Sequence, residues 1–362
     1  MKIMQIIPRF LMGGAEIMCE NLSVALHELG HEVIVVSLND YPSPITDRLE
    51  EAGLAVHYLH KKKGPDPFVL NRLRKLIKDE QPDVIHSHIN SVPYAILAGK
   101  FNKVPHIHTI HSIAKGDNVK AVRKIIHWGI RHKLLKPVAL GDVTRDSIAE
   151  EYQMAKDTIP IIGNGINLSR CIPKDSYDFS ASFHIVHIGR FEEVKNHQGI
   201  VNGFAAFRKE HPDSRLTLVG DGSLRSEVEN QIQGLHLEDA ITLTGEQKNV
   251  FGYLHEADVF LLASFYEGLP MTLIEAMGTG LPLIVTNRGG IKDTLKDQED
   301  AILIDPEAEA ITKALTRIYE SPDLRKKLGE KAKEHSKAFS SLVMAEKYLA
   351  LYEDTLRTGQ TR

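Results

Sequence analysis

Cysteine is scarce in this chain of 362 residues, which contains only Cys19 and Cys171. Two thiols far apart in the sequence, without a second pair, give neither a disulfide framework nor the ligand pattern of a metal site. Long hydrophobic runs are also missing, because the longest, such as 33–38 and 259–263, fall far short of the roughly 18–20 residues that would cross a bilayer. The opening MKIMQIIPRF leads into a Gly-Gly turn without the cleavage site of a secretory signal. We therefore expect a cytoplasmic protein.

Short β-rich runs alternate with helical stretches along the whole chain, which is typical of a parallel sheet covered by helices. With 42% hydrophobic residues, the chain is long enough for two cores of roughly 150–180 residues each. A polar, less regular stretch at 167–182 separates two series of runs. The first series of expected strands is 2–8, 32–38, 55–60, 83–88, 106–111 and 158–162, and the second is 184–188, 215–219, 240–243, 258–263, 282–286 and 301–304.

This alternation predicts two doubly wound, Rossmann-like α/β domains. The N-terminal domain is expected over 1–170 and the C-terminal domain over 171–340. A helix and tail follow at 341–362, and their apolar residues recur at helical spacing, so we expect them to pack back toward the N-terminal domain. Because ligands of such sheets collect beyond the carboxyl ends of the strands, the site is expected there, in the cleft where the two domains face each other.

A Gly-Gly turn follows the first expected strand, where Gly13 and Gly14 precede a helix that extends to about Leu29. Glycines at this place let the backbone approach a ligand at the amino terminus of a helix. The segment lacks the three-glycine dinucleotide fingerprint, and the nearest acidic residue after the second strand, Asp40, comes late for a ribose contact. A purely structural tight turn remains the alternative.

Two cations follow the first strand of the second series, in GRFEEVKNH at 189–197. Arg190 offers a planar fork of donors and Lys195 a point charge, so together they can clamp a diphosphate. Such a clamp offsets the negative charge that grows on the leaving group as a glycosidic bond breaks. A solvated, charged loop is the alternative reading of this segment.

Two carboxylates flank a predicted helix start in EGLPMTLIEAMGTGLP at 267–282. Glu267 lies in the loop and Glu275 on the opening turns of the helix, whose free backbone N–H groups can hold phosphate. Sugar and ribose both offer neighbouring hydroxyls to such acceptors. A chance pair of surface glutamates would leave the loop glycine, the proline and the apolar helix unexplained. The residues of this turn are Gly268, Leu269, Pro270, Met271 and Thr272.

The two glutamates separated by seven residues closely resemble the signature of glycosyltransferase family 4. GRFEEVKNH at 189–197, GGAE at 13–16 and VGDG at 219–222 also resemble family segments, and all four come in the family's order. The resemblance covers almost the whole chain. It implies a GT-B fold, an α/β architecture of two Rossmann-like domains facing across a cleft, and retention of configuration at the anomeric carbon. The chain is similar to bacterial enzymes that assemble surface polysaccharides.

Carried over residue by residue, the resemblance implies a donor site in which Arg190 and Lys195 bind the diphosphate. Glu267 would bind the hydroxyls of the donor sugar and Glu275 those of the ribose. The glycines of the first turn would form the loop opposite the diphosphate. The other donor-binding residues that the resemblance suggests are Asn164, in an interdomain turn, Glu246 and Gln247, near the nucleotide base, and the turn residues Gly268, Leu269, Pro270, Met271 and Thr272.

His111 is the histidine expected beside the reacting sugar. It ends HTIH at 108–111, which resembles the family's Thr-x-His segment. A neutral imidazole can hydrogen-bond a sugar hydroxyl, and its near-neutral pKa also permits proton handling. A structural role is the alternative for a histidine at a strand end. His86 and His88, which also alternate at a strand end, are weaker candidates for contact with the acceptor.

No cofactor or metal is expected. The resemblance implies that no metal is required, and no two aspartates lie two residues apart in the Asp-x-Asp arrangement. Uridine diphosphate is the favoured carrier because it is frequent in the family, and guanosine diphosphate remains open.

A basic amphipathic stretch lies at 119–135, VKAVRKIIHWGIRHKLL. Its apolar face and surrounding basic residues fit a helix in an anionic membrane interface, where Trp128 would suit the headgroup zone. The same stripe fits a helix packed on the N-terminal sheet with a solvated basic back. Further basic residues of this half are Lys61, Lys62, Lys63, Arg72, Arg74, Lys75 and Lys78. The membrane reading places the enzyme peripherally on the inner face of the cell membrane.

The resulting functional hypothesis is a retaining hexosyl- or N-acetylhexosaminyl-transferase. It uses a nucleotide-sugar donor and a glycan or lipid-linked acceptor in bacterial capsule, exopolysaccharide or lipopolysaccharide biosynthesis, with no nucleic acid among its partners. One alternative is a nucleotide-sugar 2-epimerase, which shares the fold but lacks the glutamate signature. Another is a non-catalytic nucleotide-sugar binder, which would bind donor without hydrolysis or transfer.

Overall fold

The computed structural model describes residues 1–11, 13–114, 120–179 and 182–359. Met12, from the predicted Gly-Gly turn, and Val119, from the predicted amphipathic helix, lie outside these ranges. The chain divides into two compact units. Unit 1 comprises Met1–Asn167 and Ser340–Arg362, and unit 2 comprises Leu168–Phe339. The sequence predicted domain boundaries after residues 170 and 340.

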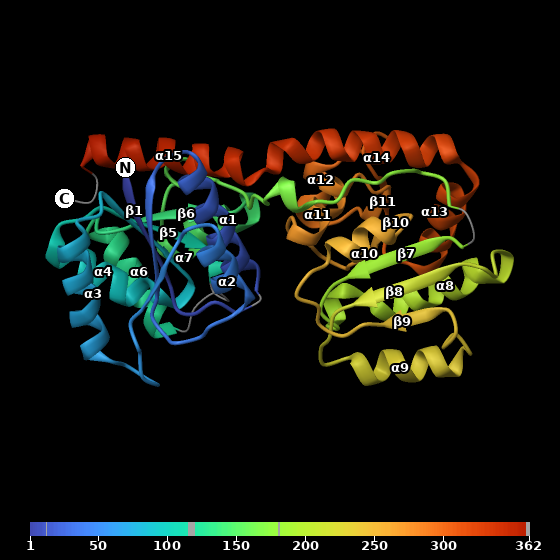
Figure 1. Cartoon of the computed structure of the whole chain (residues 1–362), viewed down its shortest axis with the longest axis horizontal. Helices are drawn as coiled ribbons and strands as arrows, with labels where there is room; N and C mark the ends of the chain where they lie inside the picture. The colour runs from blue at the N-terminus through green and yellow to red at the C-terminus, as the bar shows by residue number, and fades with distance from the viewer. Residues whose placement is uncertain (12, 115–119, 180–181, 360–362) are drawn as a thin grey trace. The chain divides into compact units, whose positions relative to one another are not determined.

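Unit 1 is built on a parallel six-stranded sheet, whose strands are drawn in blue to green in Figure 1. Their order in the sheet is β3-β2-β1-β4-β5-β6. Both faces of its central strands, β1 and β4, are buried, as expected for a parallel sheet covered by helices. The strands are β1 (Lys2–Ile7), β2 (Glu32–Ser37), β3 (Val56–Tyr58), β4 (Val84–His88), β5 (His106–Ile110) and β6 (Lys136–Ala139). The helices are α1 (Gly14–Glu28), α2 (Pro44–Glu51), α3 (Pro67–Glu80), α4 (Val92–Asn102), α6 (Lys120–Arg131), α7 (Asp142–Tyr152) and α15 (Ser341–Thr358).

Alternate side chains of each strand enter different core layers, because successive residues point to opposite faces of a sheet. On β1, Ile3 packs with residues of α1 and α15, whereas Met4 packs with residues of α3 and α4. The layer around Ile3 includes Tyr348 and Tyr352 of α15, both fully buried. The C-terminal helix is therefore part of the core of unit 1.

The sixth strand of unit 1 differs from the prediction. The sequence suggested a strand at 158–162, but the structure places β6 at Lys136–Ala139, and Ile161 forms only an isolated bridge with Ala139. β6 has four residues, and Pro137 removes one of its N–H donors, so its sequence does not read as a strand. At the sheet edge, where only one neighbour needs hydrogen bonds, this proline is tolerated.

Unit 2 repeats the architecture with a parallel sheet of order β12-β11-β10-β7-β8-β9. All six strands lie within the ranges predicted for the second series. They are β7 (His184–Ile188), β8 (Arg215–Val219), β9 (Ile241–Leu243), β10 (Val259–Leu262), β11 (Leu283–Thr286) and β12 (Ile302–Ile304). The helices are α8 (His197–Glu210), α9 (Arg225–Gly234), α10 (Phe251–Glu256), α11 (Met271–Thr279), α12 (Gly289–Thr294), α13 (Ala308–Glu320) and α14 (Pro322–Ser336).

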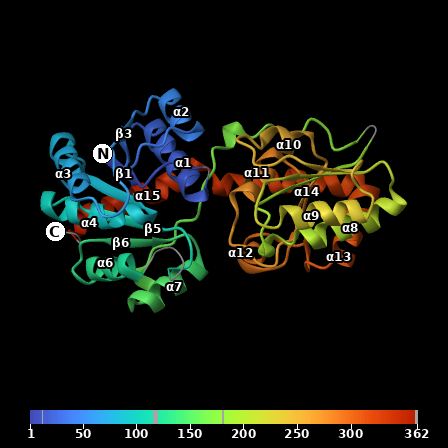
Figure 2. The same cartoon turned by 90° about the horizontal axis from the view of Figure 1, so that it is seen from below.

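Helices cover both faces of this second sheet (Figure 2). Helices α8, α9 and α13 contribute to the layer that receives Ile185 of β7, and α10 and α11 contribute to the layer that receives the next residue, Val186. Neighbouring parallel strands end at the same edge of the sheet. The loops after β7, β8, β10 and β11 therefore emerge together, and they contain most of the residues predicted for the donor site.

Candidate functional site

The loop after β7 is supported by the loop after β8. The backbone N–H of Phe191 donates to Asp221 O at 3.0 Å, and Leu224 N donates to Phe191 O at 2.9 Å. A Cβ on Gly220 or Gly222 would overlap the backbone of the first loop. The VGDG segment therefore lets the loop that bears Arg190 approach closely, and glycine is needed at Gly220 also because its φ is +140°.

Lys195 and Glu267, predicted separately, form an ion pair. The Lys195 Nζ lies 2.6 Å from Glu267 Oε1, and the Ser264 hydroxyl donates to the same oxygen at 2.7 Å. Both charged side chains are largely buried, with exposed fractions of 18% and 10%. Lys195 comes from the loop after β7 and Glu267 from the loop after β10, and these two strands are neighbours in the sheet.

Two glycines after β11 fix the position of Glu267. Neither of them was predicted as a site residue. The Gly290 N–H donates to Glu267 O at 2.9 Å. Gly289 has a φ of +58°, and a Cβ there would overlap that same carbonyl oxygen. Arg288-Gly289-Gly290 follows a buried strand, so a turn signal was present in the sequence.

The turn Gly268–Pro270 leads into α11, whose first residue is Met271. Pro270 is the N-cap, and no side chain caps the helix, so backbone N–H groups at its first turn are available to an anion. Glu275 lies one turn further along and is partly buried near Cys171. Burial raises the pKa of the Cys171 thiol, and the charge of Glu275 raises it further.

The remaining donor-site predictions of unit 2 lie in more exposed positions. The Arg190 side chain is exposed, and within residues 182–359 no hydrogen-bond or ion-pair partner is found for it. Glu246 is exposed after β9, and Gln247 is partly buried with its amide donating to Thr244 O at 2.8 Å. The structure thus brings Lys195 and Glu267 into contact but does not bring Arg190 to either of them.

In unit 1, Gly13 is the N-cap of α1 and Gly14 its first residue. A Cβ on Gly13 would contact Glu16 Oε2, whereas one on Gly14 would meet no atom within 4 Å. Asn164 is partly buried, and its neighbour Gly165 accepts a hydrogen bond from the Asn21 amide at 3.0 Å. Gly165 is required because a Cβ would collide with Ser340 and Met344 of the chain's last helical segment.

His111 lies at the carboxyl end of β5, partly exposed, with its Nε2 3.0 Å from His88 Nδ1. Burial, together with the nearby His108, lowers the pKa of His111 to about 3, so its imidazole is neutral at physiological pH. His86 and His88 are fully buried. Their suggested contact with an acceptor is therefore wrong, because a side chain without surface cannot reach one.

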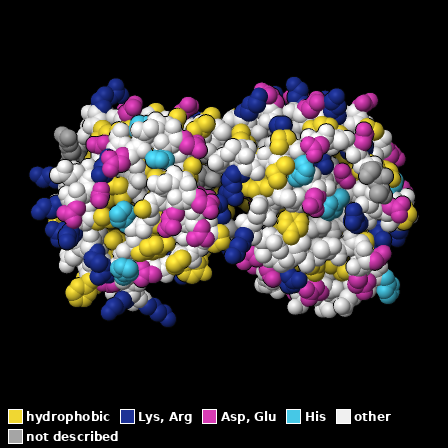
Figure 3. Space-filling view, viewed as in Figure 1, with side chains coloured by type: hydrophobic (Ala, Val, Ile, Leu, Met, Phe, Trp, Pro, Cys, Tyr) yellow, Lys and Arg dark blue, Asp and Glu magenta, His cyan; other side chains and the backbone are white. Residues whose placement is uncertain are grey.

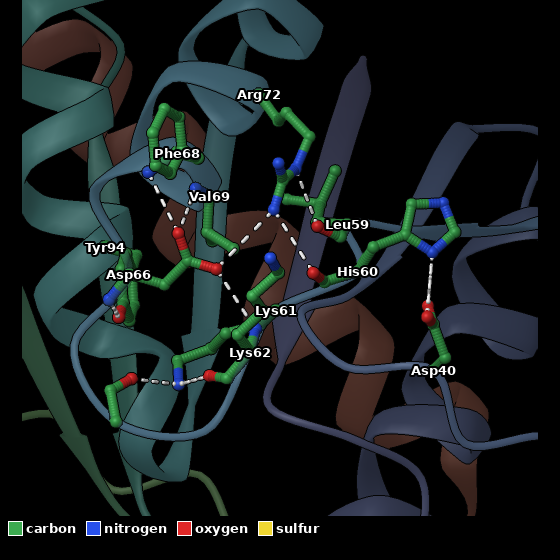
Figure 4. A network of polar contacts seen from close by, with 11 residues as sticks. Asp40, Leu59, His60, Lys61, Lys62, Asp66, Phe68, Val69, Arg72 and Tyr94 are labelled. Carbon is green, nitrogen blue, oxygen red and sulfur yellow. Dashed lines mark hydrogen bonds and ion pairs between the residues drawn. The ribbon is translucent and has the colours of Figure 1, made fainter.

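The basic loop between β3 and α3 is held by a network of hydrogen bonds and ion pairs (Figure 4). The Asp66 carboxylate accepts from the backbone of Lys62 and caps α3, and Arg72 donates to Leu59 O and His60 O. Asp40, considered for a ribose contact, instead pairs with His60, with 2.8 Å between Nδ1 and Oδ2. Lys and Arg side chains gather over this loop and α3 (Figure 3).

The apolar stripe of α6 faces inward. Ile126 is fully buried, and the other apolar residues of the stripe pack on the same core cluster as Ile110 and Ile148. These residues are Val122, Ile125, Ile130 and Leu134. Of the two readings of 119–135, the inward-packed helix with a solvated basic back describes the structure, and insertion of this stripe into a bilayer is wrong. No helix in the described ranges combines the length and hydrophobicity that a membrane crossing requires.

Within the part of the chain that the structure describes, no three His, Cys, Asp or Glu side chains are grouped to hold a metal ion.

Two family matches together cover most of the chain. Residues 12–170 match the family described as Glycosyltransferase Family 4, and residues 174–335 match the one described as Glycosyl transferases group 1. Two bacterial enzymes are similar to the chain over two thirds of its length or more. N-acetyl-alpha-D-glucosaminyl L-malate synthase of Bacillus anthracis is 26% identical over 372 residues, 95% of each chain. UDP-Gal:alpha-D-GlcNAc-diphosphoundecaprenol alpha-1,3-galactosyltransferase of Escherichia coli is 28% identical over 265 residues, 68% of each chain.

Solved structures share the fold over nearly the whole chain. A glycosyltransferase from Rickettsia africae has a TM-score of 0.80 at 21% identity and covers 98% of both chains. HepE of Anabaena, in complex with UDP, has a TM-score of 0.80 at 15% identity and covers 98% of this chain and 100% of its own. With the two parallel six-stranded sheets, these similarities confirm the predicted GT-B fold.

Proposed function

The chain belongs to glycosyltransferase family 4, and we propose that it transfers a hexosyl or N-acetylhexosaminyl group from a UDP-sugar to a glycan or lipid-linked acceptor with retention of configuration. The proposed place of this reaction is the biosynthesis of bacterial surface polysaccharide. Supporting the donor class, HepE is found with UDP, and the Escherichia coli relative is named for UDP-Gal. That relative's name also contains a diphosphoundecaprenol-linked acceptor, which supports a lipid-linked acceptor here.

The observation that carries the proposal is the buried arrangement of Lys195, Ser264 and Glu267. Glu267 Oε1 accepts from both Lys195 and Ser264, which leaves Oε2 for the hydroxyls of a donor sugar. An ammonium has three donors, so Lys195 can keep its bond to Glu267 and still meet diphosphate oxygens. The arrangement thus provides adjoining acceptor and cationic groups, as a sugar joined to a diphosphate requires.

The leaving nucleotide gains negative charge as the bond to the sugar breaks. We propose that Lys195, the exposed guanidinium of Arg190 and the uncapped start of α11 stabilise this charge. Two cationic side chains and a helix amino terminus can supply what a bound metal supplies elsewhere, so turnover is expected to persist in the presence of a chelator. Activity that a chelator abolishes and manganese restores would contradict metal independence.

A donor screen tests the proposed function. Nucleotide release from UDP-glucose, UDP-galactose and UDP-N-acetylglucosamine is measured first without and then with bacterial lipid extract, alongside GDP-mannose. We expect a UDP-sugar to be hydrolysed slowly alone and faster with the acceptor, and the anomeric configuration of the product to match the donor. Glu267→Gln removes the charge that pairs with Lys195 and should reduce this activity strongly. Interconversion of the donor at carbon 2 would indicate an epimerase, and tight binding without turnover a non-catalytic binder.

We also propose that unit 1 meets an anionic membrane through charge alone. Because the apolar stripe of α6 packs inward, its basic back faces outward. There Arg123, Lys124, Trp128 and Arg131 line one surface pocket together with Glu151, which pairs with Arg123 at 3.4 Å. Such attraction should weaken with salt, since exposed charges are screened over roughly 8–10 Å at physiological ionic strength. Replacing the three basic residues by Gln should reduce sedimentation with anionic vesicles and spare donor hydrolysis. Equal sedimentation at low salt would refute the membrane contact.

A further inference from the structure

A continuous series of buried polar contacts runs behind His111 in unit 1. His88, fully buried, lies between His111 and Gln5, with 3.0 Å from its Nδ1 to His111 Nε2 and 2.9 Å from its Nε2 to Gln5 Oε1. Gln5 is also fully buried, in the middle of β1. Within the described part of unit 1, these two contacts engage both ring nitrogens of His88.

The direction of each hydrogen bond follows from the chemistry of the groups. A carbonyl oxygen only accepts, so the His88 Nε2 that faces Gln5 Oε1 carries a proton and donates it. Burial and the surrounding histidines lower the pKa of His88, so the ring is neutral and its Nδ1 is an acceptor. Since His88 Nδ1 accepts, His111 Nε2 must donate. His111, also neutral, then has an unprotonated Nδ1.

We propose that His88 is a positioning residue that fixes His111 as the Nε2–H tautomer, so that His111 Nδ1 accepts a hydrogen bond from a hydroxyl of the bound sugar. The inference rests on the proposed transferase function for its sugar contact, but the tautomer itself does not depend on that function. The hydrogen bond that one ring nitrogen of an imidazole makes commonly decides which of the two nitrogens carries the proton.

A second set of contacts supports His88 through its neighbour on β4, His86. The ring of His86 packs against that of His88 with 4.3 Å between centroids and an angle of 37° between the ring planes. His86 in turn bonds Tyr352 Oη at 2.7 Å and Thr109 Oγ1 at 2.8 Å, and Thr109 bonds Tyr348 Oη at 2.7 Å. Both tyrosines belong to α15. The helix at the end of the chain thus supplies two hydroxyls to the support of the predicted site histidine.

The direct measurement is the tautomeric state of His111. In protein labelled with ¹⁵N-histidine, long-range proton–nitrogen correlation spectra distinguish the two nitrogens, and loss of one pattern in His111→Asn assigns the residue. We expect an unprotonated Nδ1 and a protonated Nε2 in the wild-type protein. A protonated Nδ1 on His111 would overturn the proposal whatever the activity of the enzyme, and this measurement needs no variant of His88 to fold.

The use of the tautomer is tested with three variants. His88→Leu removes the acceptor and should scramble the His111 tautomer and lower kcat about 10-fold or more at nearly constant donor KM. His88→Asn keeps an acceptor near the place of Nδ1 and should restore kcat to within about 3-fold. His106→Leu is the matched control, since His106 is equally buried but bonds Ser87 instead, and it should leave the His111 tautomer and kcat unchanged.

The outcomes separate the two proposals. If His88→Leu scrambles the tautomer but turns over normally, the sugar contact of His111 Nδ1 is refuted. If His106→Leu lowers kcat as much as His88→Leu, the loss comes from a damaged core and the positioning role is refuted. If the wild-type protein transfers no sugar in the donor screen but His111 holds its proton on Nε2, the proposed function fails while the assignment of the tautomer stands.

Discussion

Substitution of Gly289 by alanine tests how firmly the loop of Glu267 is held. Gly289 has a φ of +58°, where a side chain costs about 1–2 kcal/mol. The new Cβ would also overlap Glu267 O, so that carbonyl must move and the bond from Gly290 N, worth about 1 kcal/mol, weakens. We expect the kcat/KM of donor hydrolysis to fall about 10- to 100-fold, because a displacement near 1 Å at a reacting group can cost about that much.

Gly30→Ala is the matched control for this experiment. Gly30 has a φ of +82°, and no atom lies within 4 Å of its would-be Cβ, so alanine there carries the conformational cost without a collision. It should lower the melting temperature modestly and leave donor kinetics unchanged. Scanning calorimetry and nucleotide release on both variants make the comparison. Normal donor kinetics in Gly289→Ala would contradict the prediction. Either the collision would then be relieved without moving Glu267, or Glu267 would not contact the donor.

Three further predictions concern the cations, the ribose contact and pH. Lys195→Ala and Arg190→Ala should each lower kcat about 10²- to 10³-fold, since the charge they meet grows in the transition state, and near-normal turnover in both would refute the diphosphate clamp. Glu275→Ala should raise donor KM about 10-fold with little change in kcat, and an unchanged KM would exclude a ribose contact. Burial lowers the pKa of His108 and of His197 from 6.5 to about 4, so the unfolded chain binds more protons between these values. The free energy of unfolding should therefore be highest above pH 6.5 and fall on acidification by up to about 3 kcal/mol per histidine, and urea midpoints that stay constant from pH 7 to 4.5 would contradict this.

The sequence predicted most of both sheets, because parallel strands buried on two faces leave continuous apolar runs between helices. It missed β6, where Pro137 and a length of four residues hide the strand. It proposed 158–162 instead, since Ile159 and Ile162 are buried there, although a single bridge between Ile161 and Ala139 is all that joins the segment to β6. Local composition records burial, but it does not distinguish a paired strand from an extended segment packed beside one.

The amphipathic stretch at 119–135 shows a different limit. Its periodicity was read correctly, and α6 has the predicted apolar stripe. Periodicity states only that one face of a helix is apolar, and it cannot state what covers that face. In the structure Ile126 packs on the same cluster as Ile96 and Ile148, so the neighbours that decide between membrane and core lie outside the stretch.

The sequence predicted ligand contacts for His86, His88 and His111 from their positions at strand ends. The burial of each side chain in the structure distinguishes His111 from the other two. In β4, His86 and His88 are two residues apart and point to the same face, where both rings are enclosed. His111 lies one residue beyond β5 and is partly exposed. A single position past the end of a strand therefore decides whether a histidine can meet a ligand or can only support one that does.

The structure couples two residues of the predicted site, Lys195 and Glu267, that belong to separate sequence motifs. Lys195 and Glu267 are 72 residues apart, and they meet because β7 and β10 are adjacent in the sheet, an order that the sequence does not state. Both charges are largely buried, so removing either leaves the other with an uncompensated charge, apart from the bond that Ser264 gives to Glu267. Under the proposed function, the kinetic loss expected in Lys195→Ala therefore combines lost contact with diphosphate and a displaced Glu267. Since neighbouring residues in one network are not additive, only the double substitution compared with both single ones can separate these contributions.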